Sequence, residues 1–399
     1  MRGQRRADEP DVAVVGCGIA GAATAALIAL RGRAVTLFDR AAEPGPDSAE
    51  ALPPGVHPVL AELGLRERLL AAPRSTRSHV SELDWGNGAA PWRSSLADAG
   101  AYGYGFHVSY QELTELLIRR ASELGATVRR GCVVLGPVLV DDTVLGVRIR
   151  AADGVDRVHE AAVVVDASGP SRVVAGAVSP SPRRNGPRYT IERDLRVASM
   201  LPRRPEPHTF VTGRAAGTTG WTWLIPLGDG TTERATLRLA RTGADTRGRQ
   251  VWSGYRSSVL AGYGWLSVGD AAGVVDPLFL APAALALLAA QPAAGAIESL
   301  LDGSTRVPRH YSDVYGDVLD RVGEFADFCL DPRRRYENED TLTRNLTGLL
   351  GSRESGATLA RVRGALDGSH PLFDVDCPEG PLVASLAMPA PERPSAHGA

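Results

Sequence analysis

A glycine turn between two apolar runs constrains the fold of this chain more than any other feature. The run from Val12 to Val15 leads into Gly16-Cys17-Gly18-Ile19-Ala20-Gly21, after which an alanine-rich segment continues to about Gly32. A second apolar run, 34–38, ends at Asp39. A dinucleotide-binding unit typically has a strand, a G-x-G-x-x-G turn, a helix, a second strand and an acidic residue in this order. The sequence therefore predicts an α/β fold that begins with this unit.

Each position of the turn has a physical task. Gly16 permits the tight turn, Gly18 lets the backbone approach a pyrophosphate, and Gly21 lets the helix and strand pack closely. The helix N-terminus offers N–H groups and the positive end of its dipole to the phosphates. Asp39 is suited to accept hydrogen bonds from a ribose diol. The fingerprint alone leaves open which dinucleotide binds.

Composition excludes several classes of function. The chain has 399 residues and a formal net charge of -2, so it lacks the concentrated positive charge of a nucleic-acid-binding protein. Its four cysteines form no C-x-x-C pair, which argues against a disulfide framework and a zinc site. Glycines interrupt the apolar run 12–30, and no signal-peptide core follows the basic N-terminus. We expect a cytoplasmic protein with no metal, no nucleic-acid partner and no membrane contact.

Four later segments follow the fingerprint in a recognisable order. They are "SAEALPPGVHPVLAELGL" at 48–65, "YGFHVSYQELTELLIRRASELGATVRRG" at 104–131, "AAVVVDASGPSRVVA" at 161–175 and "GWLSVGDAAGVVDPLF" at 264–279. With the first unit, they resemble FAD-dependent monooxygenases of the glutathione-reductase-type fold, in the branch of tryptophan halogenases and tryptophan-hydroxylating flavoproteins. The resemblance extends from about residue 11 to about residue 300.

The resemblance implies both the architecture and the cofactor. We expect a three-layer ββα Rossmann-like domain that binds FAD (11–175 and 262–300), interrupted by an antiparallel-sheet substrate domain (176–261). A helical C-terminal region (301–385) and a disordered tail (386–399) would follow. The site would lie between the two sheets.

The resemblance also assigns residues to the site. In the G-D-A-A-x-x-x-D-P segment the aspartate binds the ribityl chain of FAD, which makes Asp270 the counterpart here. Glu50 would pass beside the flavin, and both Glu50 and His107 are candidate catalytic residues. Tyr110 stands where most relatives carry an arginine near a helix start, and we expect it to face the substrate. The complete predicted cofactor set is Gly16, Gly18, Ala20, Gly21, Asp39, Arg40, Glu50, Gly269, Asp270, Ala271 and Pro277.

The segment "GWTWLIPLGDGTTERATLRLA" predicts a hairpin with a turn at 228–230. Its W-T-W-L-I-P run is similar to the signature of flavin-dependent halogenases. Trp221 and Trp223 would share one strand face, either as structural filling or as a wall against water and an aromatic substrate. Halogenases of this kind use a tunnel lysine to deliver hypohalous acid, and this chain contains no lysine. Arginine lacks the tunable chemistry of an amine, so halogenation is disfavoured.

One stretch departs from the family pattern. After "DP", relatives carry small, glycine-bearing sequence beside the flavin, whereas this chain has Leu280, Ala281, Pro282 and Ala283. Proline is tolerated in the first turn of a helix, so we expect a helix here, broken near Pro292. The departure raises the question of whether flavin redox chemistry is retained.

Three functions are therefore open. The first is hydroxylation of an electron-rich, aromatic substrate through a flavin C4a-hydroperoxide, with FAD reduced by NAD(P)H directly or by a partner flavin reductase. The second is desaturation or reduction, and the third is a non-redox cyclase or binding role on an FAD fold. We favour the first. The substrate would be a small molecule, a carrier-bound group or a peptide.

Overall fold

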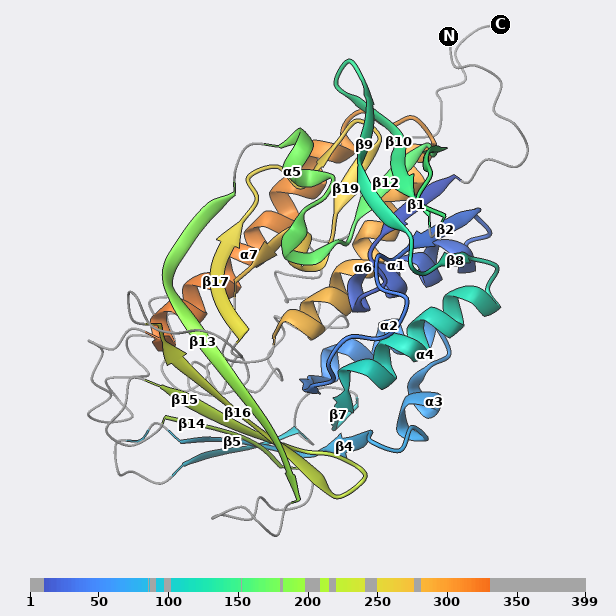
Figure 1. Ribbon diagram of the computed structural model, residues 1–399. Helices are drawn as coiled ribbons and strands as arrows, with labels where there is room; N and C mark the ends of the chain where they lie inside the picture. Colours follow the sequence, from blue (N-terminus) through green and yellow to red (C-terminus); the bar gives the residue numbers. More distant parts are fainter. Residues whose placement is uncertain are drawn as a thin grey trace, which may run out of the picture.

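The central element is a six-stranded sheet that is parallel except at one edge (Figure 1). The computed structural model describes residues 11–84, 86, 91–96, 102–151, 153–179, 182–197, 209–214, 220–240, 250–275 and 281–330. The strand order is β18 (Ala261–Gly262), β19 (Trp265–Ser267), β12 (Val163–Asp166), β1 (Val12–Val15), β2 (Val35–Phe38) and β8 (Thr127–Arg129). Only β18 runs antiparallel to its neighbour. The carboxyl ends of β1, β2 and β12 therefore meet at one edge, where α/β proteins bind nucleotides.

Strand β1 shows how this sheet is covered on both faces. Val12 and Val14 join a core with the helices α1 (Ile19–Leu30), α4 (Tyr110–Glu123) and α6 (Ala281–Leu301). Ala13 and Val15 join a second core under an antiparallel meander of β9 (Val133–Val140), β10 (Thr143–Arg150) and β11 (Asp156–Glu160). Because successive side chains of a strand point to opposite faces, the fully apolar β1 is buried on both faces of the sheet. The predicted three-layer ββα fold is confirmed.

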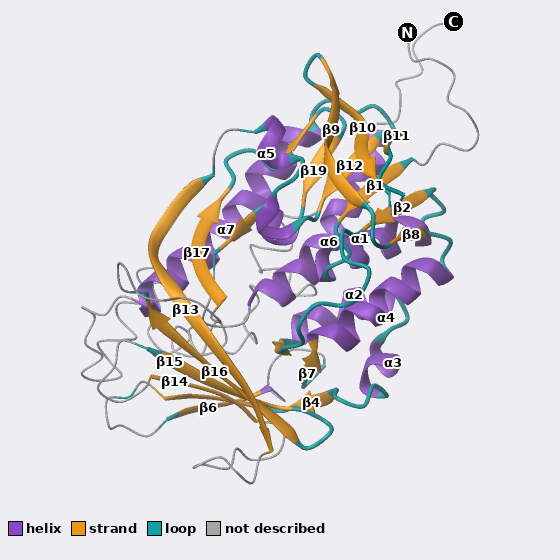
Figure 2. Ribbon diagram, viewed as in Figure 1, coloured by secondary structure: helices purple, strands orange, loops and turns teal. Residues whose placement is uncertain are grey.

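A second, eight-stranded sheet lies at the other end of the molecule (Figure 2). Its order is β20 (Gly273–Val274), β17 (Gln250–Arg256), β13 (Arg183–Val197), β16 (Thr231–Leu239), β15 (Trp221–Pro226), β14 (Thr209–Arg214), β5 (Val80–Asp84) and β6 (Trp92–Ser95). All pairs are antiparallel except β14 with β5. The sequence predicted the β15–β16 hairpin, but it gave no sign that β5 and β6 join the same sheet. The domain boundaries drawn from the sequence stay a prediction.

Smaller elements connect the two sheets. A three-stranded sheet lies between them, in the order β3 (Ala49–Leu52), β7 (Gly105–Ser109) and β4 (Thr76–Ser78). Along the chain, β3 is followed by a 3-10 helix, η1 (Pro54–Val56), and then by α2 (His57–Glu62) and α3 (Arg66–Leu70). The 3-10 helices η3 (Gly169–Ser171) and η5 (Gly269–Ala271) follow β12 and β19, and α5 (Ala175–Val178) follows η3. Helix α7 (Val307–Leu330) buries Tyr311, Tyr315, Val318 and Leu319. The predicted tail, 386–399, lies outside the described residues.

Helix α6 differs from its prediction at one point. The sequence predicts a break near Pro292, but the helix continues through this residue. Ala289, Ala290, Ala293 and Ala294 on either side are buried against the core, so packing holds the helix together despite the hydrogen bond that proline cannot make. The segment Pro282–Leu301 has the length and hydropathy of a membrane span, and 56% of its apolar window is buried inside the protein, as is usual for a core helix.

Candidate functional site

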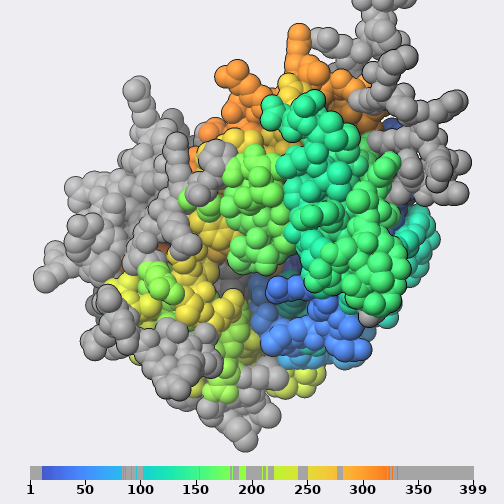
Figure 3. Space-filling model, turned by 45° about the horizontal axis from the view of Figure 1, so that its top comes forward, coloured from blue at the N-terminus to red at the C-terminus, as the bar shows by residue number. Residues whose placement is uncertain are grey.

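A cavity of about 510 Å³ opens at the carboxyl edge of the parallel sheet. Its walls come from the β1–α1 turn, the end of β2 with the following loop 39–46, the first turns of α4, the start of β9 and η3. Figure 3 shows this face, where blue N-terminal segments and the green segments from β9 to α5 border a hollow. The predicted fingerprint residues Gly16 and Gly18 line this cavity, together with Asp39 and Arg40.

The three fingerprint glycines have different surroundings. Gly16 has φ +109°, and a Cβ there would overlap the carbonyl oxygen of Ala167. A Cβ on Gly21 would overlap the carbonyl oxygen of Gly16. A Cβ on Gly18 would meet only the Tyr110 hydroxyl, at 3.1 Å. Gly18 also caps α1 without a side-chain hydrogen bond, so the helix N-terminus is open for an anion. The cavity and turn therefore fit the adenosine and pyrophosphate half of FAD.

Asp39 lies at the end of β2, as predicted. Its carboxylate accepts hydrogen bonds from the backbone N–H groups of Cys17 at 3.0 Å and Ala41 at 2.9 Å. These bonds hold the side chain at the cavity wall, where it can also accept from a ribose diol. Neighbouring Arg40 is exposed at the cavity rim.

The turn after β19 packs directly on the fingerprint helix. Gly269 has φ +58°, and a Cβ there would lie 2.7 Å from the Cβ of Ala20. Ala271 is fully buried, whereas Asp270 is partly exposed. Burial raises the pKa of Asp270 to about 6, and the Tyr255 hydroxyl donates to its backbone carbonyl. Gly269, Asp270 and Ala271 thus lie beside the α1 N-terminus, while Pro277 and Leu280 lie outside the described residues.

Glu50 is a buried carboxyl between the two sheets. It is 8% exposed, and the Ser48 hydroxyl donates to its Oε1 at 3.2 Å. Burial raises the pKa of Glu50 to about 7; Arg193 opposes this effect, and Glu233 adds to it. A carboxyl that titrates near neutrality is suited to exchange protons with a substrate.

Glu233 and Arg193 lie near Glu50 and are not among the residues predicted for the site. Glu233 on β16 accepts from the backbone N–H of Ala49 at 2.9 Å and from Arg193 Nη1 at 2.5 Å. The guanidinium carbon of Arg193 lies 6.0 Å from the centre of the Trp223 ring. The sequence contains a signal for Glu233. The inward-facing positions of this strand, 235 and 237, extend back to position 233, where a carboxylate is unexpected.

The remaining predicted residues fall in two places. Trp221 and Trp223 are both buried on one face of β15, the face that also carries Glu233 through β16. His107 is buried on β7, and its Nδ1 lies 2.9 Å from the carbonyl oxygen of Pro226 at the end of β15. Tyr110 lines the cofactor cavity, away from the tryptophans of β15.

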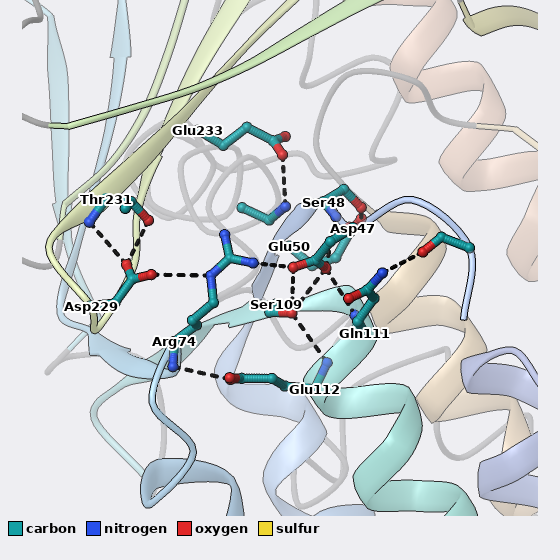
Figure 4. A network of polar contacts seen from close by, with 12 residues as sticks. Asp47, Ser48, Glu50, Arg74, Ser109, Gln111, Glu112, Asp229, Thr231 and Glu233 are labelled. Atoms are coloured by element: carbon teal, nitrogen blue, oxygen red, sulfur yellow. Dashed lines mark hydrogen bonds and ion pairs between the residues drawn. The ribbon is translucent and has the colours of Figure 1, made fainter. Parts of the chain in front are cut away.

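A polar network joins the loop before β3, which contains Asp47, to the second sheet (Figure 4). Asp47 accepts from the Ser109 hydroxyl at 2.8 Å and from the backbone N–H of Gln111 at 3.0 Å, and it forms an ion pair with Arg74. Arg74 also contacts Asp229, in the β15–β16 turn, at 3.2 Å. The Arg74 guanidinium therefore links the loop before β3 to the sheet hairpin, and Asp47 in turn binds the start of α4.

No cluster of three or more His, Cys, Asp or Glu side chains arranged to hold a metal ion occurs in the part of the chain that the structure describes.

Comparison with known proteins places this geometry in a family. Residues 14–66 match a NAD(P)-binding Rossmann-like domain, and residues 95–331, more than half of the chain, match the tryptophan halogenase family. A tryptophan 2-halogenase from Chondromyces crocatus is 26% identical over 330 residues, which are 73% of this chain and 62% of the relative. A 3-amino-4-hydroxybenzoate 2-monooxygenase from Streptomyces cremeus is 33% identical over 201 residues, 48% of this chain and 47% of the relative. The matches thus span about half to three fifths of these relatives' length.

The fold is similar to that of a solved relative. The flavin-dependent brominase Bmp2 superposes with a TM-score of 0.72 at 18% identity, covering 91% of this chain and 100% of that structure. The family match and the fingerprint cavity agree on a flavin-binding protein. The chain belongs to the tryptophan halogenase family of flavin-dependent oxidoreductases, and its cofactor is FAD.

Proposed function

We propose that this protein is an FAD-dependent monooxygenase that hydroxylates an electron-rich aromatic substrate. The observation that carries the proposal is the absence of lysine from the whole chain, since halogenation in this family depends on a lysine amine. The 33% identity to a monooxygenase that acts on an aminohydroxybenzoate supports the same choice. The substrate would be a small aromatic molecule, free, carrier-bound or within a peptide.

The residues of the cavity would hold the cofactor by its ends. The backbone of the 16–21 turn would contact the pyrophosphate, Asp39 the adenosine ribose and Asp270 the ribityl chain. Bound reduced FAD supplies two electrons to molecular oxygen and so provides the oxygen atom that enters the product. NAD(P)H, or a separate flavin reductase, would supply those electrons.

The second sheet would position the aromatic ring. Trp221 and Trp223 are buried and would form an apolar wall that excludes water. One atom of oxygen replaces a ring hydrogen and the other leaves as water, so the ring must lose a proton. Ionised Glu50 would accept this proton or that of an activating phenol, and its pKa of about 7 suits the task.

The test is an isotope experiment with the purified holoenzyme. FAD, NADH and a generic flavin reductase are combined with 3-amino-4-hydroxybenzoate or tryptophan under labelled oxygen gas. A product with one labelled oxygen supports hydroxylation. Substrate turnover without incorporated oxygen or halogen would favour desaturation or reduction, and a protein that binds no FAD would favour a non-redox role; either result would overturn the proposal.

Halogenation is the second candidate, because β15 carries the W-T-W-L-I-P run and the family match covers the strands of the second sheet that lie between residues 183 and 274. The same assay with added bromide separates the two. A brominated product would show that another side chain can replace the amine.

A further inference from the structure

The Tyr110 side chain lies at the phosphate end of the cofactor cavity. Tyr110 is the first residue of α4, directly after the capping residue Ser109. Its hydroxyl is 3.1 Å from the position that a Cβ on Gly18 would occupy, and both residues line the cavity. Because Gly18 caps α1, the phenol oxygen stands beside the helix N-terminus, where N–H groups receive phosphates.

The charged residues of the cavity wall leave this end without a cation. The lining contains two arginines, Arg40 and Arg130, and three carboxylates, Asp39, Glu43 and Glu115. Arg130 is paired with Glu115 at 2.5 Å, and Arg40 follows Asp39 at the ribose end. A pyrophosphate would therefore meet more negative than positive charge on the side chains that the structure describes here.

The position of Arg172 and the protonation of the Tyr110 phenol also decide which charges this end of the cavity carries. Arg172 follows the cavity residue Ser171 but does not line the cavity; its side chain is buried, and its charge lowers the pKa of Tyr255. Burial, with added effects of Asp270 and Glu50, raises the pKa of Tyr110 to about 12, while the contacts of its hydroxyl with Thr114 and with the backbone of Ile19 oppose this effect. The Tyr110 hydroxyl therefore keeps its proton at neutral pH and can act as a neutral donor.

We propose that Tyr110 is a cofactor-binding residue whose hydroxyl donates a hydrogen bond to the pyrophosphate of FAD. This places it at the phosphates and not at the substrate. The pyrophosphate is then held by backbone N–H groups and a phenol, without a charged side chain. Since salt screens interactions between charges, the affinity for FAD should depend weakly on ionic strength.

The role can be measured without any turnover. We would titrate the full chain with FAD, with ADP, which has the pyrophosphate but no flavin, and with adenosine, which lacks the phosphates. Tyr110→Phe removes only the hydroxyl and should weaken FAD and ADP binding about tenfold or more, as expected for a hydrogen bond to a charged group. Adenosine binding should be unchanged. Tyr263→Phe, at a tyrosine that is 54% exposed, is the matched control and should bind all three ligands as the parent does.

The salt dependence provides a second arm, and its first measurement is made on the parent protein alone. The parent's Kd for ADP should change by less than about threefold between about 50 and 500 mM NaCl, whereas Tyr110→Arg should bind ADP with a clearly steeper dependence. Unchanged ADP and FAD binding in Tyr110→Phe, or a steep dependence in the parent, would overturn the proposal. Because ADP binding involves no oxidation, a failure of the monooxygenase assay would not affect this result.

Discussion

The glycines of the fingerprint differ in what a methyl group would meet. At Gly16 and Gly21 it would overlap backbone carbonyl oxygens inside the fold, whereas at Gly18 it would point toward the cavity and the Tyr110 hydroxyl. The first two positions therefore serve folding, and the third serves the ligand. The sequence pattern treats all three alike, and only the packing separates them.

This difference predicts opposite effects for two alanine substitutions. Gly21→Ala should lower the free energy of unfolding by about 1–3 kcal/mol, the usual cost of overpacking, because backbone must shift. Gly18→Ala should leave unfolding nearly unchanged but weaken FAD binding, because the methyl group fills the space of the phosphate. Urea denaturation and flavin-fluorescence titration of both variants check this. Equal losses of stability in the two would contradict it.

Glu50 should make stability depend on pH. Its pKa is raised from 4.5 to about 7 in the folded protein, so between these values the unfolded chain releases a proton that the folded chain retains. The free energy of unfolding should fall as pH rises through this window, by about 3 kcal/mol for a shift of this size. Glu50→Gln should lack this contribution. The free energy of unfolding of the variant minus that of the parent should therefore be larger at pH 8 than at pH 5. Parallel pH profiles of the two proteins would show that Glu50 is ionised at its usual pKa.

At the scale of elements, helix α6 shows tertiary packing overriding local preference. Proline in a helix interior costs about 3 kcal/mol, yet α6 continues past Pro292 because the residues on both sides are buried. Pro292→Ala should therefore restore a hydrogen bond and raise the free energy of unfolding by about 1–3 kcal/mol. Gln291→Ala, at a partly exposed position paired with Glu62, is the control and should stay within about 0.5 kcal/mol. A loss of stability in Pro292→Ala would mean that the proline ring itself fills a needed space.

The Arg74 network connects three elements, so its loss should affect more than one of them. Arg74 and Asp47 are 22% and 19% exposed, and removal of the guanidinium takes from Asp47 and Asp229 the charged partner that the described residues provide. Arg74→Ala should lower the free energy of unfolding by about 1–3 kcal/mol. It should also speed hydrogen exchange in the loop 43–48 and in the β15–β16 turn, which mass spectrometry can follow. Arg68→Ala, which breaks a more exposed ion pair with Glu123, is the control and should change neither segment.

At the scale of the whole molecule, the cofactor cavity is assembled from segments between residues 15 and 173. FAD that binds only the folded chain should raise the apparent free energy of unfolding by about 2.7 kcal/mol at a hundredfold excess over its Kd. Thermal denaturation with and without FAD checks this, with Gly18→Ala as the variant that should gain less. A thermal midpoint that does not respond to saturating FAD would indicate binding to unfolded chain as well.

The sequence predicted what is local and missed what is assembled from distant segments. Gly16 to Asp39 form one continuous unit with a fixed order of elements, so the dinucleotide-binding fold could be predicted from it. The later segments that resemble the family then added the family and FAD. Glu233 meets Ala49 across 184 positions, and Arg74 meets Asp229 only once the hairpin has folded against the loop. Such contacts depend on strand register and on the placement of whole sheets, which no short pattern encodes.

The eight-stranded sheet has a consequence for building chimaeric enzymes. Strands β5 and β6 come from residues 80–95, and β5 pairs with β14 from residues 209–214. This sheet, which we propose positions the substrate, is therefore not encoded by a single continuous segment of the chain. A recombinant that borrows this sheet from a relative must exchange both segments together, since a single crossover would leave β14 paired with a strand from the wrong parent.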